Sequence, residues 1–235
     1  HKGALVATIS GTCESPWRAL TAHVDTLGAM VKEIKSNGRL KVSKLGGFAW
    51  NTVEGEGVTV YTRAGKTLRG SILLSKASSH VHGQDVSKTE RNDDTMEVRL
   101  DVRTSSAKET ADAGINVGDF VVFDPRVEKT NGFIRSRHLD DKACVACLIF
   151  ALKALFDAGL KPKTTIVLHI SNYEEVGHGA AAGIPPQVTE LISVDMAAVG
   201  DGQASDEFHA TLCVKDSGGP YHFGLNQQLL HLADA

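Results

Sequence analysis

The chain has 235 residues, enough to bury a sizeable core in one large domain or two smaller ones. Its net charge of −3 gives no broad electrostatic reason to expect nucleic acid or an anionic membrane as a partner. Apolar residues make up 42%, yet no apolar run approaches the ~20 residues that a membrane-spanning helix needs. We therefore expect a globular protein with no nucleic acid and no membrane as partner.

The cysteines indicate a compartment. Cys144 and Cys147 form a C-x-x-C pattern, which in other settings binds zinc or carries redox chemistry. Here the neighbours from 143 to 150 are apolar and helical in period, so small buried side chains are the better interpretation. We therefore expect a reduced, cytoplasmic protein.

The first part of the chain, up to about Leu27, contains two apolar runs, Ala4–Ile9 and Ala19–Val24, which we expect to form buried strands. Short alternating strands and turns follow. The runs 30–34 and 39–42 flank Ser36-Asn37-Gly38, and Asn-Gly is a strong hairpin signal. The runs 58–62 and 67–74 repeat this pattern, and 98–102 and 120–123 continue it. Residues 80–94 read as a polar loop.

The period changes in the last part of the chain. Residues 142–158 show a helical pattern with Val145, Leu148, Leu152 and Leu155 on one face, and Gly159 follows as a C-cap. Residues 164–170 and 191–194 read as buried parallel strands. We therefore predict an α/β fold: a layered domain of residues 1–29 and 127–235, interrupted by a β-rich, barrel-like insert of residues 30–126.

Acids and histidines gather where the predicted strands and the helix end or begin. The four motifs are A-H-V-D-T-L-G (22–28), H-L-D-D-K (138–142), N-Y-E-E-V-G (172–177) and S-V-D-M (193–196). Carboxyl ends of parallel strands commonly form the site of an open α/β sheet. Carboxylates and imidazoles are also the ligands that divalent metals require, and a pair of metals needs one bridging carboxylate.

Individual roles follow from the spacing. His23 can bind a metal while Asp25, two residues on, accepts its other ring N–H. Glu174 and Glu175 are adjacent at a strand exit and point differently, so one can ligate while the other acts as a base. Each motif also has an ordinary explanation, as a hydrogen-bonded pair, a helix cap, a solvated turn or a loop anchor. The ordered combination, rather than any single motif, favours a metal site.

Together with L-G-G-F and G-I-N-V-G-D, these motifs resemble the cytosolic co-catalytic metallo-aminopeptidases, which include the tetrahedral, glutamyl and deblocking aminopeptidases. The likeness covers nearly the whole chain. It implies two divalent metal ions, zinc or cobalt, in the α/β domain. It also implies peptide substrates, and a dimerisation insert that builds a homo-oligomer from dimers, with a dodecamer as one candidate size.

The resemblance assigns the site residues. His23 and Asp195 would hold one metal, Asp140 would bridge both, and Glu175 would hold the second. Asp140 is preferred to Asp141 because the family's ligand is the first acid of this pattern. Glu174 would be the general base, and Asp25 would orient His23. The family's last ligand is a histidine beyond residue 235, so we expect this chain to be a fragment.

Three alternatives remain open from the sequence. A related two-metal carboxypeptidase or N-deacylase would use nearly the same ligands. A glucanase would need two carboxyls flanking one bond, about 5–9.5 Å apart, whereas the acids here accompany a histidine in a ligand pattern. A non-catalytic peptide-binding scaffold would not need the complete set of visible ligands and base.

Overall fold

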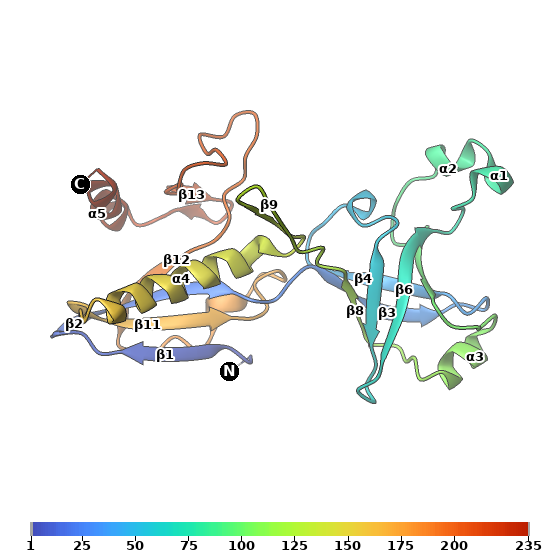
Figure 1. The fold of residues 1–235 in the computed structure, drawn as a ribbon, viewed down its shortest axis with the longest axis horizontal. Helices are drawn as coiled ribbons and strands as arrows, with labels where there is room; N and C mark the ends of the chain where they lie inside the picture. Colours follow the sequence, from blue (N-terminus) through green and yellow to red (C-terminus); the bar gives the residue numbers. More distant parts are fainter. Residues whose placement is uncertain (1, 235) are drawn as a thin grey trace. The chain divides into compact units, whose positions relative to one another are not determined.

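The computed structural model describes residues 2–234, and the chain divides into two compact units after Val194. The first unit contains a closed β-barrel and a four-stranded sheet with a long helix (Figure 1). This mixed α/β architecture with a barrel confirms the predicted fold class. The barrel strands run from Gly28 to Phe123. The predicted division into domains at residues 29 and 127 stays a prediction.

The barrel closes in the order β3-β4-β7-β6-β5-β8, and every neighbouring pair is antiparallel. Alternate side chains point inward because successive residues of a strand face opposite sides. Val58 and Val60 on β5 are both fully buried, for example. The strands are β3 (Gly28–Ile34), β4 (Leu40–Leu45), β5 (Gly57–Tyr61), β6 (Thr67–Leu74), β7 (Met96–Leu100) and β8 (Phe120–Phe123).

The turns of the barrel follow the local sequence. Gly38, in the predicted hairpin turn between β3 and β4, has φ of +80°, a conformation that glycine adopts at low cost. The segment near residues 80–94, which we expected to be a polar loop, instead contains two short helices. Short, exposed helical turns are hard to predict from the sequence. The remaining short elements are η1 (Trp50–Thr52), α1 (Ser79–His82), α2 (Asp85–Lys88) and α3 (Ala107–Asp112).

The sheet has the order β1-β11-β2-β12. Strands β11 (Thr164–Ser171) and β12 (Val188–Ser193) run parallel to β2 (Cys13–His23), as predicted. Strand β1 (Leu5–Ile9) pairs antiparallel with β11 at the edge of the sheet. Leu5 is 58% exposed, so the expectation of a buried first strand was wrong, because an edge strand has only one neighbour.

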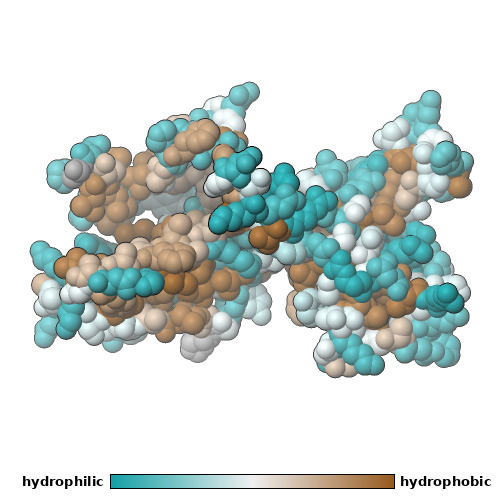
Figure 2. Space-filling view, viewed as in Figure 1, coloured by the Kyte–Doolittle hydropathy of each residue, from teal (hydrophilic) through white to brown (hydrophobic). Residues whose placement is uncertain are grey.

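Helix α4 (Leu139–Asp157) packs on this sheet through Leu148 and Leu152, two residues of the predicted apolar face. Cys144 is only half buried and Cys147 is exposed, which corrects the expectation of buried thiols. A single stripe of α4 contacts the sheet, and the helix is apolar beyond that stripe. Figure 2 shows hydrophobic side chains along α4; the large exposed ones are Leu139, Ile149, Phe150 and Phe156.

A small hairpin, β9 (Glu128–Thr130) and β10 (Phe133–Arg135), lies between β8 and α4 in the sequence. The first unit also includes η2 (Gly179–Ala181). The second unit consists of β13 (Lys215–Asp216), β14 (Gly219–Pro220), α5 (Phe223–Ala233) and the loops between them. Among the described residues, no helix has both the length and the apolar character of a transmembrane span.

Candidate metal centre

Two of the four motifs leave the sheet side by side. Strands β2 and β11 are parallel neighbours that end in register, with His23 opposite Ser171. The backbone N–H of Val24 donates to the carbonyl of Ser171 at 3.1 Å. The residues that follow, 24–25 from β2 and 172–175 from β11, therefore emerge at one edge of the sheet. This is the edge where open α/β sheets bind ligands.

His23 is the buried centre of the cluster, with 2% of its surface exposed. Its Nδ1 lies 3.1 Å from the backbone carbonyl of Asp25, and a carbonyl can only accept, so Nδ1 carries the proton. In the neutral ring, Nε2 then keeps its lone pair. It faces Oδ1 of Asp140 at 3.1 Å and Oε2 of Glu174 at 3.5 Å. A lone pair aimed at two carboxylates is favourable only with a cation or a proton between them.

Asp25 binds the backbone of the turn that carries Glu174 and Glu175. Its two carboxylate oxygens accept the backbone N–H groups of Glu174 and Glu175, at 3.2 and 3.1 Å. The sequence predicted instead that this carboxylate would accept the ring N–H of His23. Oδ1 lies 3.4 Å from Nδ1, farther than the backbone carbonyl of the same residue. Asp25 thus contacts both strand exits, because it bridges His23 and the two glutamates.

The two acids at the start of α4 separate in function. Asp140 has ψ of 109°, outside the helical region, and Asp141 has ψ of 25°. Asp140 presents its carboxylate to the His23 ring, and its role as a bridging ligand stays a prediction. Asp141 is fully buried and accepts the backbone N–H of His23 at 3.1 Å. From the sequence, a helix cap was the only role considered for Asp141; the doubled acid was the signal for a second role, because adjacent side chains at a helix start point apart.

Charge accumulates at this edge. Burial, followed by the neighbouring charge of Asp140, raises the pKa of Glu175 to about 7. Lys142 is the nearby cation, and its ammonium donates to the carbonyl of Val24 at 2.9 Å. Burial lowers the pKa of Lys142, although the surrounding acids act to raise it. The carboxyl groups of Asp25, Asp140, Glu174 and Glu175 therefore face one amine and one imidazole, which leaves an excess of negative charge.

The residues present fit a divalent cation. Donor atoms of His23, Asp140 and Glu175 lie within 4.8 Å of one another, close enough to converge on one ion. Imidazole and carboxylate oxygen are the ligands that zinc and cobalt accept. A cation would also relieve the lone-pair and carboxylate repulsion around Nε2. Three predicted ligands thus lie together, with the predicted base beside them.

Asp195 follows directly after Val194 and is the first residue of the second unit. Its place among the ligands stays a prediction. His222 is the N-cap of α5, and its Nδ1 accepts the backbone N–H of Leu225 at 3.1 Å. On α1, His80 is exposed and His82 is partly buried.

One turn of the barrel also reaches the site. Gly46, in the L-G-G-F motif after β4, has φ of +86°. A Cβ built on it would lie 3.2 Å from the carbonyl oxygen of Glu175 and 2.4 Å from Cδ2 of Leu27. The barrel therefore contacts the backbone of a predicted metal ligand, and only a residue without a side chain fits there unstrained.

The sequence profile of the M42 glutamyl aminopeptidase family matches residues 3–235. The chain belongs to this family. It is 51% identical over 235 residues to YhfE of Bacillus subtilis (strain 168), a protein with a provisional aminopeptidase name. The match covers 100% of this chain and 68% of that relative. The M42 peptidases are metallo-enzymes that hydrolyse peptide bonds, in agreement with the hydrolase predicted from the motifs.

Two solved structures extend the comparison. Aminopeptidase APDkam598 of the archaeon Desulfurococcus kamchatkensis is 28% identical with a TM-score of 0.78, over 99% of this M42 chain and 65% of that one. The TET1 peptidase of Pyrococcus horikoshii, which can assemble into a tetrahedron or a large octahedral shell, is 24% identical with a TM-score of 0.76, over 98% and 68%. The chain thus spans about two thirds of these relatives.

Proposed function

We propose that this chain is the metal-binding part of an aminopeptidase that removes N-terminal residues from peptides. His23, Asp140, Glu175 and Asp195 are the proposed ligands of two divalent cations, zinc or cobalt. The observation that carries the proposal is the approach of the His23 imidazole to the carboxylates of Asp140 and Glu174 at the end of parallel strands. Membership of the M42 family supports the same reaction.

The chain's own residues divide the work. Divalent cations, when bound, supply a water of lowered pKa and polarise the scissile carbonyl. Glu174 accepts the proton of the attacking water and returns it to the leaving amine. Its side chain is half exposed, as access to substrate and water requires. Asp25 keeps Glu174 in place through the backbone, and Asp141 does the same for His23.

The test compares two adjacent glutamates. In the full-length enzyme, Glu174→Gln keeps the shape of the side chain but cannot accept a proton, so turnover should fall by roughly 10²-fold or more while metal content stays nearly unchanged. Glu175→Gln should lose metal affinity together with activity. Metal analysis and peptidase rates of both variants decide. Loss of metal from Glu174→Gln alone would exchange the two roles; full activity in both variants would refute the assignment.

The substrate class is tested separately. An aminopeptidase hydrolyses a chromogenic amide with a free α-amine and leaves its N-acetylated form intact, whereas an N-deacylase acts on the acylated compound. A chelator should abolish the first activity, and added zinc or cobalt should restore it. Release of reducing sugar from glucan in the presence of the chelator would instead revive the glycosidase alternative.

We also propose that the barrel mediates self-association and that the protein is cytoplasmic. The assembly of the Pyrococcus horikoshii TET1 peptidase into a tetrahedron or a large octahedral shell supports self-association. Sedimentation of the protein at micromolar concentration should show a dimer or a larger species. A monomer with an intact barrel would contradict the proposed self-association.

A further inference from the structure

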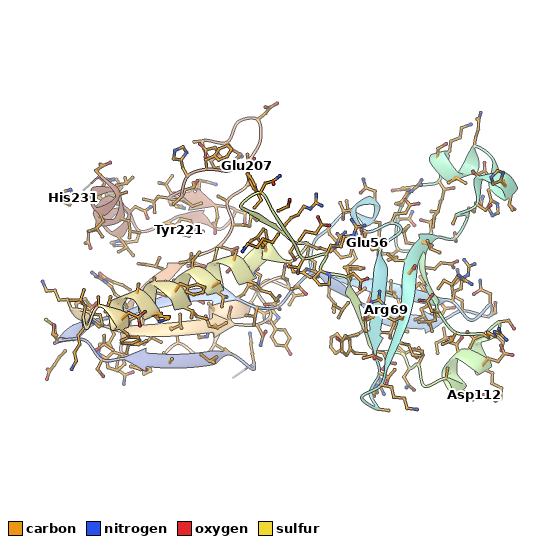
Figure 3. The ribbon with its side chains drawn as sticks, viewed as in Figure 1. Glu56, Arg69, Asp112, Glu207, Tyr221 and His231 are labelled. Atoms are coloured by element: carbon orange, nitrogen blue, oxygen red, sulfur yellow. The ribbon has the colours of Figure 1, made fainter. Side chains whose placement is uncertain are left out.

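We propose that Glu56, a carboxylate of the barrel, is a positioning residue for the metal centre: it fixes Arg137 and thereby the start of α4, which carries Asp140. The inference rests on the proposed metal centre and concerns how that centre is held in shape. Glu56 lies between η1 and β5 and is labelled in Figure 3 at the end of the barrel. It is buried, with 5% of its surface exposed.

The ionic partners of Glu56 lie outside the barrel strands. Its Oε1 contacts the guanidinium groups of Arg126 and Arg137, the second at 2.8 Å. Arg126 follows β8, and Arg137 precedes α4, so the two arginines flank the β9–β10 hairpin. A buried carboxylate shared by two arginines makes strong, charge-assisted contacts. Glu56 therefore clamps the chain where it leaves the barrel and where it approaches the helix.

Arg137 is held at more than one point. Besides Glu56, its guanidinium donates to the carbonyl of Thr52 at 3.0 Å, and its backbone N–H donates to the carbonyl of Pro125 at 2.8 Å. A planar guanidinium with two partners is fixed in direction as well as in position. On either side, Ser136 donates to Pro125 at 2.9 Å and His138 to the carbonyl of Phe123 at 3.4 Å.

Arg137 is close to the proposed metal centre along the chain. Three residues lead from Arg137 to Asp140, a stretch that spans at most ~10 Å. His138, the residue before α4, makes no side-chain cap contact, so the helix start relies on the anchored segment before it. Functional groups must be held to within about 0.5 Å of their working positions. Loosening Arg137 should therefore displace Asp140 from the His23 ring.

The barrel contains a matched control. Glu97, on β7, is equally buried and also contacts two cations, Lys35 and Arg39. Both of those partners belong to the β3–β4 hairpin, inside the barrel sequence. Glu97→Gln therefore removes a comparable buried ion pair without touching the segment that leads to α4. Any effect that Glu56→Gln has and Glu97→Gln lacks reports on that segment rather than on barrel stability.

The first measurement is zinc affinity, by competition with a fluorescent chelator. Glu56→Gln and Arg137→Gln should each raise the zinc dissociation constant roughly tenfold, the scale typical of residues that support metal ligands. The double variant should lose less zinc affinity than the two single losses added together, because both single variants remove the shared Glu56–Arg137 contact. Glu97→Gln should leave zinc affinity within about twofold. Equal zinc affinity in wild type and Glu56→Gln would overturn the inference.

The second measurement needs no metal. In the metal-free protein, Glu56→Gln should speed amide hydrogen exchange in residues 138–145 by roughly tenfold, while Glu97→Gln leaves these amides unchanged. If Glu56→Gln fails to fold, Arg137→Lys replaces it, because one ammonium cannot reproduce the two-partner fork. Unchanged exchange at 138–145 refutes the inference. A wild type that binds no zinc refutes the proposed function instead, and leaves this readout intact.

Discussion

The barrel and the sheet differ in how many apolar side chains they bury. Among the described residues, sixteen buried apolar side chains form the barrel core, whereas five form the cluster between α4 and the sheet. A closed barrel has no edge and buries its inner face by itself. The sheet has two edges, and Leu5 and Leu191 on its outer strands are 58% and 45% exposed. Stability is therefore concentrated in the barrel.

Chemistry is concentrated in the other region. The buried titratable side chains of the sheet and α4 include His23, Asp141 and His169. They lie near the ends of β2 and β11 and at the start of α4. In the barrel, the buried acids Glu56 and Glu97 are each matched by two cations. The barrel therefore supplies a rigid support, and the sheet with α4 supplies an electrostatically unbalanced site. Four experiments test this division.

The largest effect should come from the barrel core. Phe123 is 1% exposed and packs edge-on against Phe48 with ring centroids 5.4 Å apart. Phe123→Ala should lower the free energy of unfolding by about 3–5 kcal/mol, through lost burial and the cavity left behind. Phe150→Ala, on the exposed side of α4, should change it by no more than about 0.5 kcal/mol. Urea unfolding measures the free energy of unfolding of both variants. Equal losses would show that the barrel core is not the more stabilising region.

Acid should weaken the sheet through His169. The residue is fully buried between the Thr21 hydroxyl, 3.0 Å from Nδ1, and the Ala182 carbonyl, 3.1 Å from Nε2. Burial lowers the pKa of His169, so the unfolded chain takes up a proton below about pH 6.5 that the folded one does not. The stability that neutral His169 contributes is fully present above that pH, and it is lost as the pH falls toward the pKa of His169 in the folded protein.

The measurement is the free energy of unfolding at pH 7, 6 and 5. His169 should account for a decline of up to about 1.4 kcal/mol per pH unit within that window, and His169→Gln should flatten the slope accordingly. His80→Gln, on the exposed helix α1 of the insert, serves as the control and should leave the slope unchanged. A slope that is the same in wild type and His169→Gln would exclude His169 as the cause.

A smaller effect is expected where the two regions touch. Gly46→Ala places a side chain at φ of +86° beside the backbone of Glu175, so it should cost about 1–2 kcal/mol of stability. Gly47→Ala meets nothing within 4 Å and should change stability by at most about 0.5 kcal/mol. Thermal unfolding of the two variants provides the comparison. Indistinguishable midpoints would show that the turn tolerates a side chain.

The smallest effect concerns a helix cap on the barrel. The Ser106 hydroxyl accepts the backbone N–H of Glu109 at the start of α3, and the Glu109 carboxylate accepts that of Ser105 at 2.6 Å. Ser106→Ala should cost about 0.5–1 kcal/mol, and Ser106→Thr should retain most of the cap. Urea unfolding measures both. A Thr variant as unstable as the Ala variant would mean that the hydroxyl is not the stabilising group.

Much of the fold could be predicted because its signals are local. Asn37-Gly38 predicted the β3–β4 turn, and the spacing of Leu148 and Leu152 predicted the buried face of α4. The exposure of Leu5 and Cys147 could not be predicted, because it depends on which neighbours lie beside a strand or helix. Apolar character alone does not distinguish an edge strand from a central one.

The motifs at strand and helix ends were enough to predict that His23, Asp140, Glu174 and Glu175 lie together. How the adjacent acids divide their contacts became visible only in the folded chain, where Asp140 lies at the imidazole and Asp141 on the backbone of His23. That division depends on backbone angles at one helix start and on contacts between residues more than one hundred positions apart. Likewise, the contact between Glu56 and Arg137 exists because folding brings two distant segments together. A local sequence pattern encodes neither the division between Asp140 and Asp141 nor the contact between Glu56 and Arg137.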